Sequence, residues 1–386
     1  MRSDMDMLTH LDVAPSTLAD FQAGDSLFAT PREVYHGRGA GLRAAPVGEV
    51  ARRAAELLSE ASDRPAAPVL LGLLPFDPGR PAQLLVPDVL HRMSAPRALP
   101  PSGPTSVLGC TEHPSGAAYE QGVRDVLARM ALDPTLRKVV LARTLRIALE
   151  QPADLRRILG RLWLHNPAGY TYAVPLDGGE CFVGASPELL VRREGRRVTL
   201  HPLAGTAARH PDPGIDAHGA RALLDSPKDL REHAIVIEAI ETVLRPLCRT
   251  LDIPARPSLT ATARLWHLGT PISGELADPA IGALDLALAL HPTPAVCGLP
   301  AAAARQAIAQ TEPFERGYFA GAVGWCDAQG DGAWSVAIRC AHAAGRELTL
   351  YAGAGIVPGS VPEQERIETG NKLRTILDAL DLDSTP

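Results

Sequence analysis

Successive apolar stretches near the C-terminus, separated only by short turns, constrain the fold more than any other feature of the chain. They are AGAVGWCD (320–327), GAWSVAIRCAHAA (332–344) and ELTLYAGAGIV (347–357), and each reads as a strand. A helical segment is expected after Pro362. Strands grouped in blocks, with helices between the blocks, are typical of an α+β fold with antiparallel sheets. We therefore predict that class and not a doubly wound parallel sheet.

The composition of the 386-residue chain excludes several functional classes. A net charge of -6 with 46% hydrophobic residues indicates a globular protein without a basic surface for nucleic acid or a membrane. The apolar runs are too short to span a bilayer, and the N-terminus has no signal-peptide core. Six cysteines without a CxxC pair indicate neither a zinc site nor a disulfide framework. We expect reduced thiols and a cytoplasmic protein.

The chain contains few signs of a boundary between domains. We expect residues 1–25 to be poorly structured and residues 77–115, which are rich in proline, to form an irregular connection. No glycine-rich phosphate-binding motif follows a strand, so a nucleotide site has little support. The sequence does not fix the oligomeric state, and a monomer is compatible with it.

Two acidic pairs stand at helical spacing in distant parts of the chain. Asp229 and Glu232 follow a good N-cap signal, so capping and the helix dipole can explain Asp229. Glu365 and Glu368 share a helix face with Lys372, as expected for a solvated face with an internal ion pair. If the two pairs instead face each other, four carboxylates need a cation between them, and Mg²⁺ prefers such oxygen ligands. The residues alone leave both interpretations open.

Other polar residues lie in apolar or glycine-rich surroundings. Glu188 ends an apolar strand, where partial desolvation would suit a general acid, although such a strand end can also be solvated. Lys138 opens an apolar strand and either acts as a base or extends its amine to solvent. Arg339 lies within an apolar strand and needs an anion there. His267 can be a core residue, and the glycines of 352–360 permit close approach of backbone amides to a ligand.

Ten runs of the sequence resemble the chorismate-utilising enzymes, and most closely the isochorismate synthases. They occur in family order over about residues 135–377 and read KVVLART, FVGASPELLV, HPLAGTAAR, SPKDLREH, WHLGTPISGEL, ALHPTPAVCGLP, EPFERGYFAGAVGWCD, WSVAIRCA, LYAGAGIVPGS and EQERIETGNKL. Near the N-terminus, SLFATPREVYHGRG and LLGLLPFDP are similar to the synthases of catechol siderophore pathways. The resemblance implies one large α+β domain over residues 26–380, with two packed antiparallel sheets flanked by helices.

The resemblance also implies a role for each candidate residue in the reversible conversion of chorismate to isochorismate. The Mg²⁺ ligands would be Glu232 and Glu368, with Asp229 and Glu365 as the acidic partners behind them. Lys138 would be the base that activates water, and Glu188 the acid that protonates the departing C4 hydroxyl. The substrate-binding positions would be Thr206, His267, Arg339, Gly353 and Lys372.

Related activities are separated by a few positions. Ala204 stands where aminodeoxychorismate synthases with a lysine nucleophile carry that lysine. Amine-adding members such as anthranilate synthase need an ammonia source, and we expect no glutaminase subunit here. Salicylate synthases share the acid, base and metal residues and remain the alternative enzyme, although HPTPAVCG and AIRCA resemble the isochorismate branch more. A catalytically inactive chorismate-binding subunit would have lost an acid, base or metal ligand, and none is lost.

Overall fold

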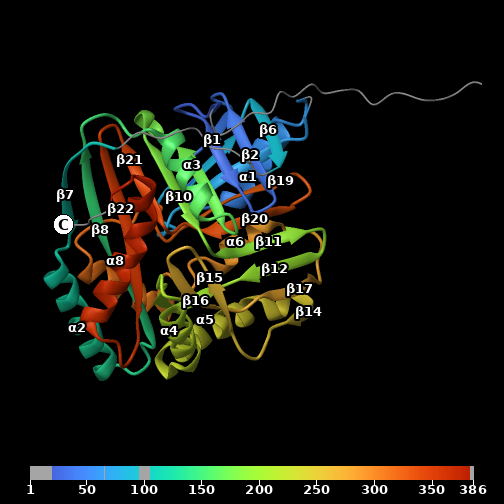
Figure 1. The fold of residues 1–386 in the computed structure, drawn as a ribbon. Coiled ribbons are helices and arrows are strands. Elements are labelled where there is room, and N and C mark those ends of the chain that lie inside the picture. Colours follow the sequence, from blue (N-terminus) through green and yellow to red (C-terminus); the bar gives the residue numbers. More distant parts are fainter. Residues whose placement is uncertain (1–19, 65, 95–104, 383–386) are drawn as a thin grey trace, which may run out of the picture.

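Two large antiparallel sheets form the centre of the protein in a computed structural model, which describes residues 20–64, 66–94 and 105–382 (Figure 1). Within these residues the first sheet has ten strands, and β7 (Val107–His113) pairs with β8 outside the main order. The main order is β18 (Gly298–Leu299), β8 (Lys138–Leu149), β22 (Glu347–Ile356), β21 (Cys340–Ala344), β10 (Cys181–Ser186), β9 (Tyr170–Pro175), β1 (Ser26–Ala29), β2 (Glu33–Arg38) and β6 (Val89–Ser94).

The second sheet has nine strands in the same described part of the chain, and eight helices flank the sheets. Its order is β14 (Cys248–Asp252), β17 (Ile272–Leu276), β12 (Arg197–His201), β11 (Leu189–Glu194), β20 (Gly332–Val336), β19 (Ala322–Asp327), β4 (Val69–Leu74), β5 (Gln83–Val86) and β3 (Leu42–Ala44). The helices are α1 (Val50–Glu60), α2 (Gly116–Leu132), α3 (Leu155–His165), α4 (Pro213–Asp225), α5 (Pro227–Leu244), α6 (Ala283–Leu290), α7 (Ala301–Thr311) and α8 (Pro362–Ala379). The predicted α+β class is confirmed.

A third, three-stranded sheet lies beside the two large ones and was not predicted. It consists of β13 (Leu203–Ala208), β16 (Leu265–Gly269) and β15 (Ser258–Ala261). The pairing of β13 with β16 places Thr206 opposite His267. Helix α5 packs against β13, so this small sheet connects the helix to the rest of the fold.

The faces of the two large sheets meet in the main hydrophobic core. Tyr35 of the first sheet stacks at a tilt on Trp325 of the second, with ring centroids 4.6 Å apart. Trp334 is the largest fully buried side chain among the described residues. It packs over two glycines, because a Cβ atom at Gly72 or Gly324 would lie 2.5 or 2.8 Å from its ring. Small residues in these strands therefore make room for the aromatic rings between the sheets.

A second core lies on the other face of the first sheet, where α3 and α8 cover it (Figure 1). Leu145 and Ile147 of β8 are fully buried there, together with Leu373 and Ile376 of α8. The first eight residues of β8 are all buried, as expected for a strand covered on both faces. This packing fixes α8 along its length.

Two predictions about the N-terminal third require correction. Most of the segment 1–25 lies outside the described residues, but Phe21 is buried and Asp25 lies 2.8 Å from the His36 ring. The stretch 77–115, expected to be irregular, contains β5, β6 and β7. Strands β6 and β7 lie at edges of the first sheet and are largely exposed, so they lack the apolar alternation that identifies a strand.

Other sequence predictions concern membranes and thiols. None of the helices in the described ranges is long and apolar enough to cross a membrane. All six cysteines are free.

We predict that Trp334→Ala lowers the free energy of unfolding by about 3–5 kcal/mol, because it removes a fully buried ring and leaves a cavity. Urea unfolding followed by circular dichroism measures the change. Leu164→Ala, at a position 62% exposed, is the control and should change stability by about 0.5 kcal/mol or less. Equal effects of the two substitutions would contradict the packing described here.

Candidate active site

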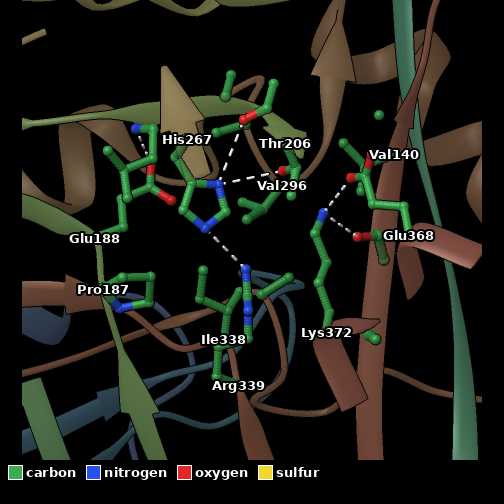
Figure 2. Close-up of a pocket in the computed structure, with 18 of the residues that line it drawn as sticks. Val140, Pro187, Glu188, Thr206, His267, Val296, Ile338, Arg339, Glu368 and Lys372 are labelled. Atoms are coloured by element: carbon green, nitrogen blue, oxygen red, sulfur yellow. Dashed lines mark hydrogen bonds and ion pairs between the residues drawn. The ribbon is translucent and has the colours of Figure 1, made fainter. Parts of the chain in front are cut away.

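Most of the predicted site residues converge on one cavity of about 670 Å³, including its opening (Figure 2). Figure 2 shows Glu188, His267 and Arg339 on one side of it and Lys372 with Glu368 on the other. The predicted residues that line the cavity are Glu188, Thr206, Glu232, His267, Arg339, Gly353, Glu368 and Lys372. Lys138, Asp229 and Glu365 are the predicted residues that do not line it.

Arg339 is a buried cation without an anion. Its side chain is 6% exposed, and no carboxylate of the described residues lies within ion-pair distance of it. Burial lowers its pKa to about 10, so the guanidinium stays charged at neutral pH. Its backbone has φ of 52°, and Ala320 on the same cavity wall has φ of 62°. Such strained backbone tends to occur at functional sites, and the unpaired guanidinium needs a bound anion.

His267 holds the Arg339 guanidinium in place. Arg339 donates to His267 Nε2 at 3.3 Å, so the other ring nitrogen carries the proton. That nitrogen, Nδ1, lies 3.2 Å from Thr206 Oγ1 and 3.4 Å from the Gly205 carbonyl oxygen. Burial lowers the pKa of His267 well below its ordinary value, so the ring is neutral. A neutral imidazole can accept from arginine, and it adds no charge to the site.

Glu188 is a buried carboxyl group that is protonated over part of the neutral range. It stands after Pro187 between β10 and β11 and is 4% exposed. Its Oε1 accepts one hydrogen bond, from the Leu203 amide at 3.3 Å. Burial raises the pKa of Glu188 to about 7, and the single backbone hydrogen bond opposes this only in part. A carboxyl group with such a pKa can give and take a proton at neutral pH.

Lys138 lies behind the cavity wall and forms an ion pair with Glu232. It is fully buried, and its Nζ is 3.0 Å from Glu232 Oε1. The distance fits a hydrogen bond but the angle does not, so Nζ makes no hydrogen bond to the described groups. Burial acts to raise the pKa of Glu232, but the ammonium groups of Lys138 and Lys228 outweigh it and lower the pKa.

The close approach of Lys138 and Glu232 depends on Gly355 in β22. A Cβ atom at this position would overlap Glu232 Oε1 and lie 2.8 Å from Lys138 Cε. The sequence predicted that the glycines of 352–360 would allow backbone to approach a ligand. At Gly355 the glycine instead makes room for the two charged side chains.

The acidic cluster is arranged as ion pairs. Glu368 Oε1 is 2.7 Å from Lys372 Nζ, which also donates to the Gly353 carbonyl at 2.7 Å. Asp229 and Glu365 line an adjoining cavity, together with Lys228. In the described ranges no three His, Cys, Asp or Glu side chains converge closely enough to hold a metal by themselves.

The sequence did not identify Lys228. Its Nζ lies 3.0 Å from Glu365 Oε1, between α5 and α8. Burial and the charge of the neighbouring Glu368 raise the pKa of Glu365 to about 7. The available signal was the rarity of lysine, since only three of the 38 Lys and Arg residues are lysines. The predicted N-cap of α5 is present, because Ser226 Oγ accepts from the Asp229 amide at 3.3 Å.

The fold and the site define a class of enzyme in which buried acidic and basic side chains surround a cavity for a small anionic substrate. The profile of the family described as "Chorismate binding enzyme" matches residues 86–381. The chain belongs to this family.

Relatives with assigned names are similar over nearly the whole chain. The isochorismate synthase DhbC of Bacillus subtilis is 44% identical, over 96% of this chain and 97% of that protein. The vibriobactin-specific isochorismate synthase of Vibrio cholerae is 44% identical over 87% of this chain and 86% of its own. A crystal structure of a putative 2,3-dihydroxybenzoate-specific isochorismate synthase, DhbC from Bacillus anthracis, has a TM-score of 0.89 at 40% identity. It covers 95% of this chain and 98% of that chain.

We predict that Gly355→Ala lowers the free energy of unfolding by about 1–3 kcal/mol, because the new methyl group forces Lys138 and Glu232 apart. Gly109→Ala is the matched control, since a Cβ atom there meets nothing within 4 Å. Urea unfolding of the two variants measures the difference. If both were as stable as the parent protein, the close contact at Gly355 would not exist in solution.

Proposed function

We propose that this protein is an isochorismate synthase, which interconverts chorismate and isochorismate for a 2,3-dihydroxybenzoate or catechol siderophore pathway. The similarity to named synthases over nearly the full chain supports the reaction and the pathway. The observation in this chain that carries the proposal is Arg339, a buried guanidinium without an anion that faces a cavity with an acid near pKa 7. A substrate with two carboxylates supplies the missing anion.

The cations on the two sides of the cavity would hold the two substrate carboxylates. Arg339 offers a planar fork that matches one carboxylate, and His267 and Thr206 keep this fork in position. Lys372 would bind the other carboxylate, because its ammonium group lies on the opposite wall near Gly353. The substrate ring would then lie between Glu188 and the acidic cluster.

The reaction exchanges one oxygen for another, so it needs one acid and one base. The oxygen of a water molecule bonds to C2 of the ring, the two ring double bonds each shift by one position, and the bond from C4 to its hydroxyl oxygen breaks. Glu188 would give its proton to the departing oxygen, which leaves as water. To act as the base, Lys138 would first give up its ammonium proton, and the free lone pair on Nζ would then take a proton from the attacking water, which restores the ammonium that pairs with Glu232. Substrate and product are isomers, and the two roles are exchanged in the reverse direction.

Water is the nucleophile that this site favours. Ala204 lines the cavity where relatives with a lysine nucleophile carry an amine, and a methyl group cannot add to the ring. We accordingly propose that the protein acts without a glutaminase subunit. A cytoplasmic location, where chorismate is made, is part of the same proposal.

The charges of the site fit a divalent cation. With Glu188 protonated and Glu365 ionised beside the Lys228 ammonium, four carboxylates balance four cations in the site. The carboxylates are Asp229, Glu232, Glu365 and Glu368, and the cations are Lys138, Lys228, Lys372 and Arg339. A substrate with two carboxylates adds two negative charges, which a divalent cation would neutralise. Carboxylate oxygens suit Mg²⁺, and Glu232 and Glu368 are the ligands that also face the substrate cavity. Bound there, Mg²⁺ would act as a Lewis acid toward the ring carboxylate.

The direct test is to identify the product formed from chorismate and Mg²⁺ by chromatography, with pyruvate measured in parallel by lactate dehydrogenase. We expect isochorismate to accumulate to equilibrium with chorismate, and pyruvate to stay near background. Pyruvate formed in step with the loss of chorismate would instead assign a salicylate synthase. No turnover of chorismate would refute both enzymes and leave a binding subunit.

We predict that Glu188→Gln lowers kcat by about 10²–10⁴-fold with little change in KM, because it removes a proton donor and keeps the shape. In the parent enzyme kcat for isochorismate formation should fall as the pH rises through about 7, since Glu188 loses its proton there. Initial rates over a pH series check both points. A mainly raised KM in the variant would make Glu188 a substrate-positioning residue.

A further inference from the structure

All lysines of the chain lie in or beside the active site. Of 38 Lys and Arg residues, only Lys138, Lys228 and Lys372 are lysines. At surface ion pairs such as Arg53 with Glu56, the chain uses arginine. A compact ammonium group thus occurs only where buried or half-buried carboxylates gather. Two of these lysines already have roles in the proposed reaction, and Lys228 has none.

Lys228 lies among more carboxylates than the other two lysines. Its Nζ is 3.0 Å from Glu365 Oε1 and 3.8 Å from both Asp229 Oδ1 and Glu232 Oε2. Lys138 and Lys372 each pair with a single carboxylate. The three carboxylates around Lys228 belong to α5 (Asp229 and Glu232) and α8 (Glu365). These are the helices whose acidic pairs were predicted to hold Mg²⁺. The ammonium group therefore stands where a cation between the two helices would be bound.

The adjoining cavity gives this ammonium group room to move. The cavity holds about 860 Å³ including its opening and is lined by Lys228, Asp229 and Glu365. It shares Thr206 and Glu368 with the wall of the substrate cavity. Two of its lining side chains, Val361 and Ile367, are 45% and 49% exposed, so the cavity lies at the surface. The lysine stem can swing outward there without crossing the core.

We propose that the ammonium group of Lys228 fills the cation position of the metal-free site, and that a divalent cation binds by displacing it into the adjoining cavity. The inference rests on the proposed Mg²⁺ requirement. Lysine suits this exchange because its ammonium is a single point charge on a flexible stem. An arginine fork would hold two carboxylate oxygens at once and resist displacement. The lysine thus keeps the acidic helices together without metal and sets the affinity for metal.

The test is a calorimetric titration of Mg²⁺ into the substrate-free full-length protein and its Lys228→Met variant. Without the competing ammonium group, the variant should bind Mg²⁺ about tenfold or more tightly, since displacing one charge-assisted contact no longer opposes binding. The metal-free variant should also unfold at a lower temperature than the metal-free parent protein. Saturating Mg²⁺ should reduce this difference in unfolding temperature. Arg245→Met is the control, because it removes the same charge at the other end of α5, where Arg245 pairs with Glu241.

The outcomes separate this inference from the proposed function. The inference is overturned if the parent and Lys228→Met proteins bind Mg²⁺ with equal Kd and if Mg²⁺ does not reduce the difference between their unfolding temperatures. Lys228 would then be a structural residue. Failure of both proteins to bind Mg²⁺ would refute the metal site itself. Lys228→Arg gives a second test if the methionine variant does not fold. It should bind Mg²⁺ more weakly than the parent protein, and equal or tighter binding would contradict displacement.

Discussion

The buried ion pair between Lys138 and Glu232 is the interaction on which the site depends. It connects the first residue of β8, in the first large sheet, with α5, which packs against the small sheet. Removing one partner of such a pair typically costs about 3–5 kcal/mol, because the other charge is left buried and unpaired. Apolar replacement of both partners is often neutral or stabilising, so stability alone does not explain the pair. We explain it by the proposed reaction, which needs a carboxylate on the cavity wall and a base directly behind it.

Burial acts on Glu188, His267 and Arg339 on the cavity wall and favours the neutral form of each. It raises the pKa of Glu188 to about 7, lowers that of His267 and brings that of Arg339 to about 10. The first group becomes a proton donor at neutral pH and the second a neutral hydrogen-bond acceptor. Only Arg339 keeps a full charge, and the strained backbone at φ of 52° holds it on the cavity wall. One physical cause thus gives three residues different functions.

The fold could be predicted from the sequence wherever strands are apolar and continuous. Strands β8, β19 and β22 carry that signal, and the structure contains each of them. The edge strands within 77–115 and the third sheet were missed, because exposed or short strands have no clear alternation.

The motifs predicted residues that the structure brings mostly to one cavity, but they did not predict the partner and depth of each side chain. Lys138 was predicted to be the base that activates water, and the structure places it behind Glu232 and not on the cavity wall, because the sequence does not tell which of two buried groups reaches the cavity. Lys228 was not identified from the sequence, because Lys228 and its partner Glu365 lie 137 positions apart in the chain. Such contacts depend on tertiary packing and not on local spacing.

We propose that substrate and divalent cation together complete the charge balance of this site. Calorimetry with Glu188→Gln, in which turnover is slow, measures the Kd of chorismate with and without Mg²⁺, and that of Mg²⁺ with and without chorismate. We expect each ligand to tighten the binding of the other by the same factor, because thermodynamic coupling is reciprocal. If chorismate bound equally well with and without Mg²⁺, the two ligands would not be coupled, and the proposed charge balance would be wrong.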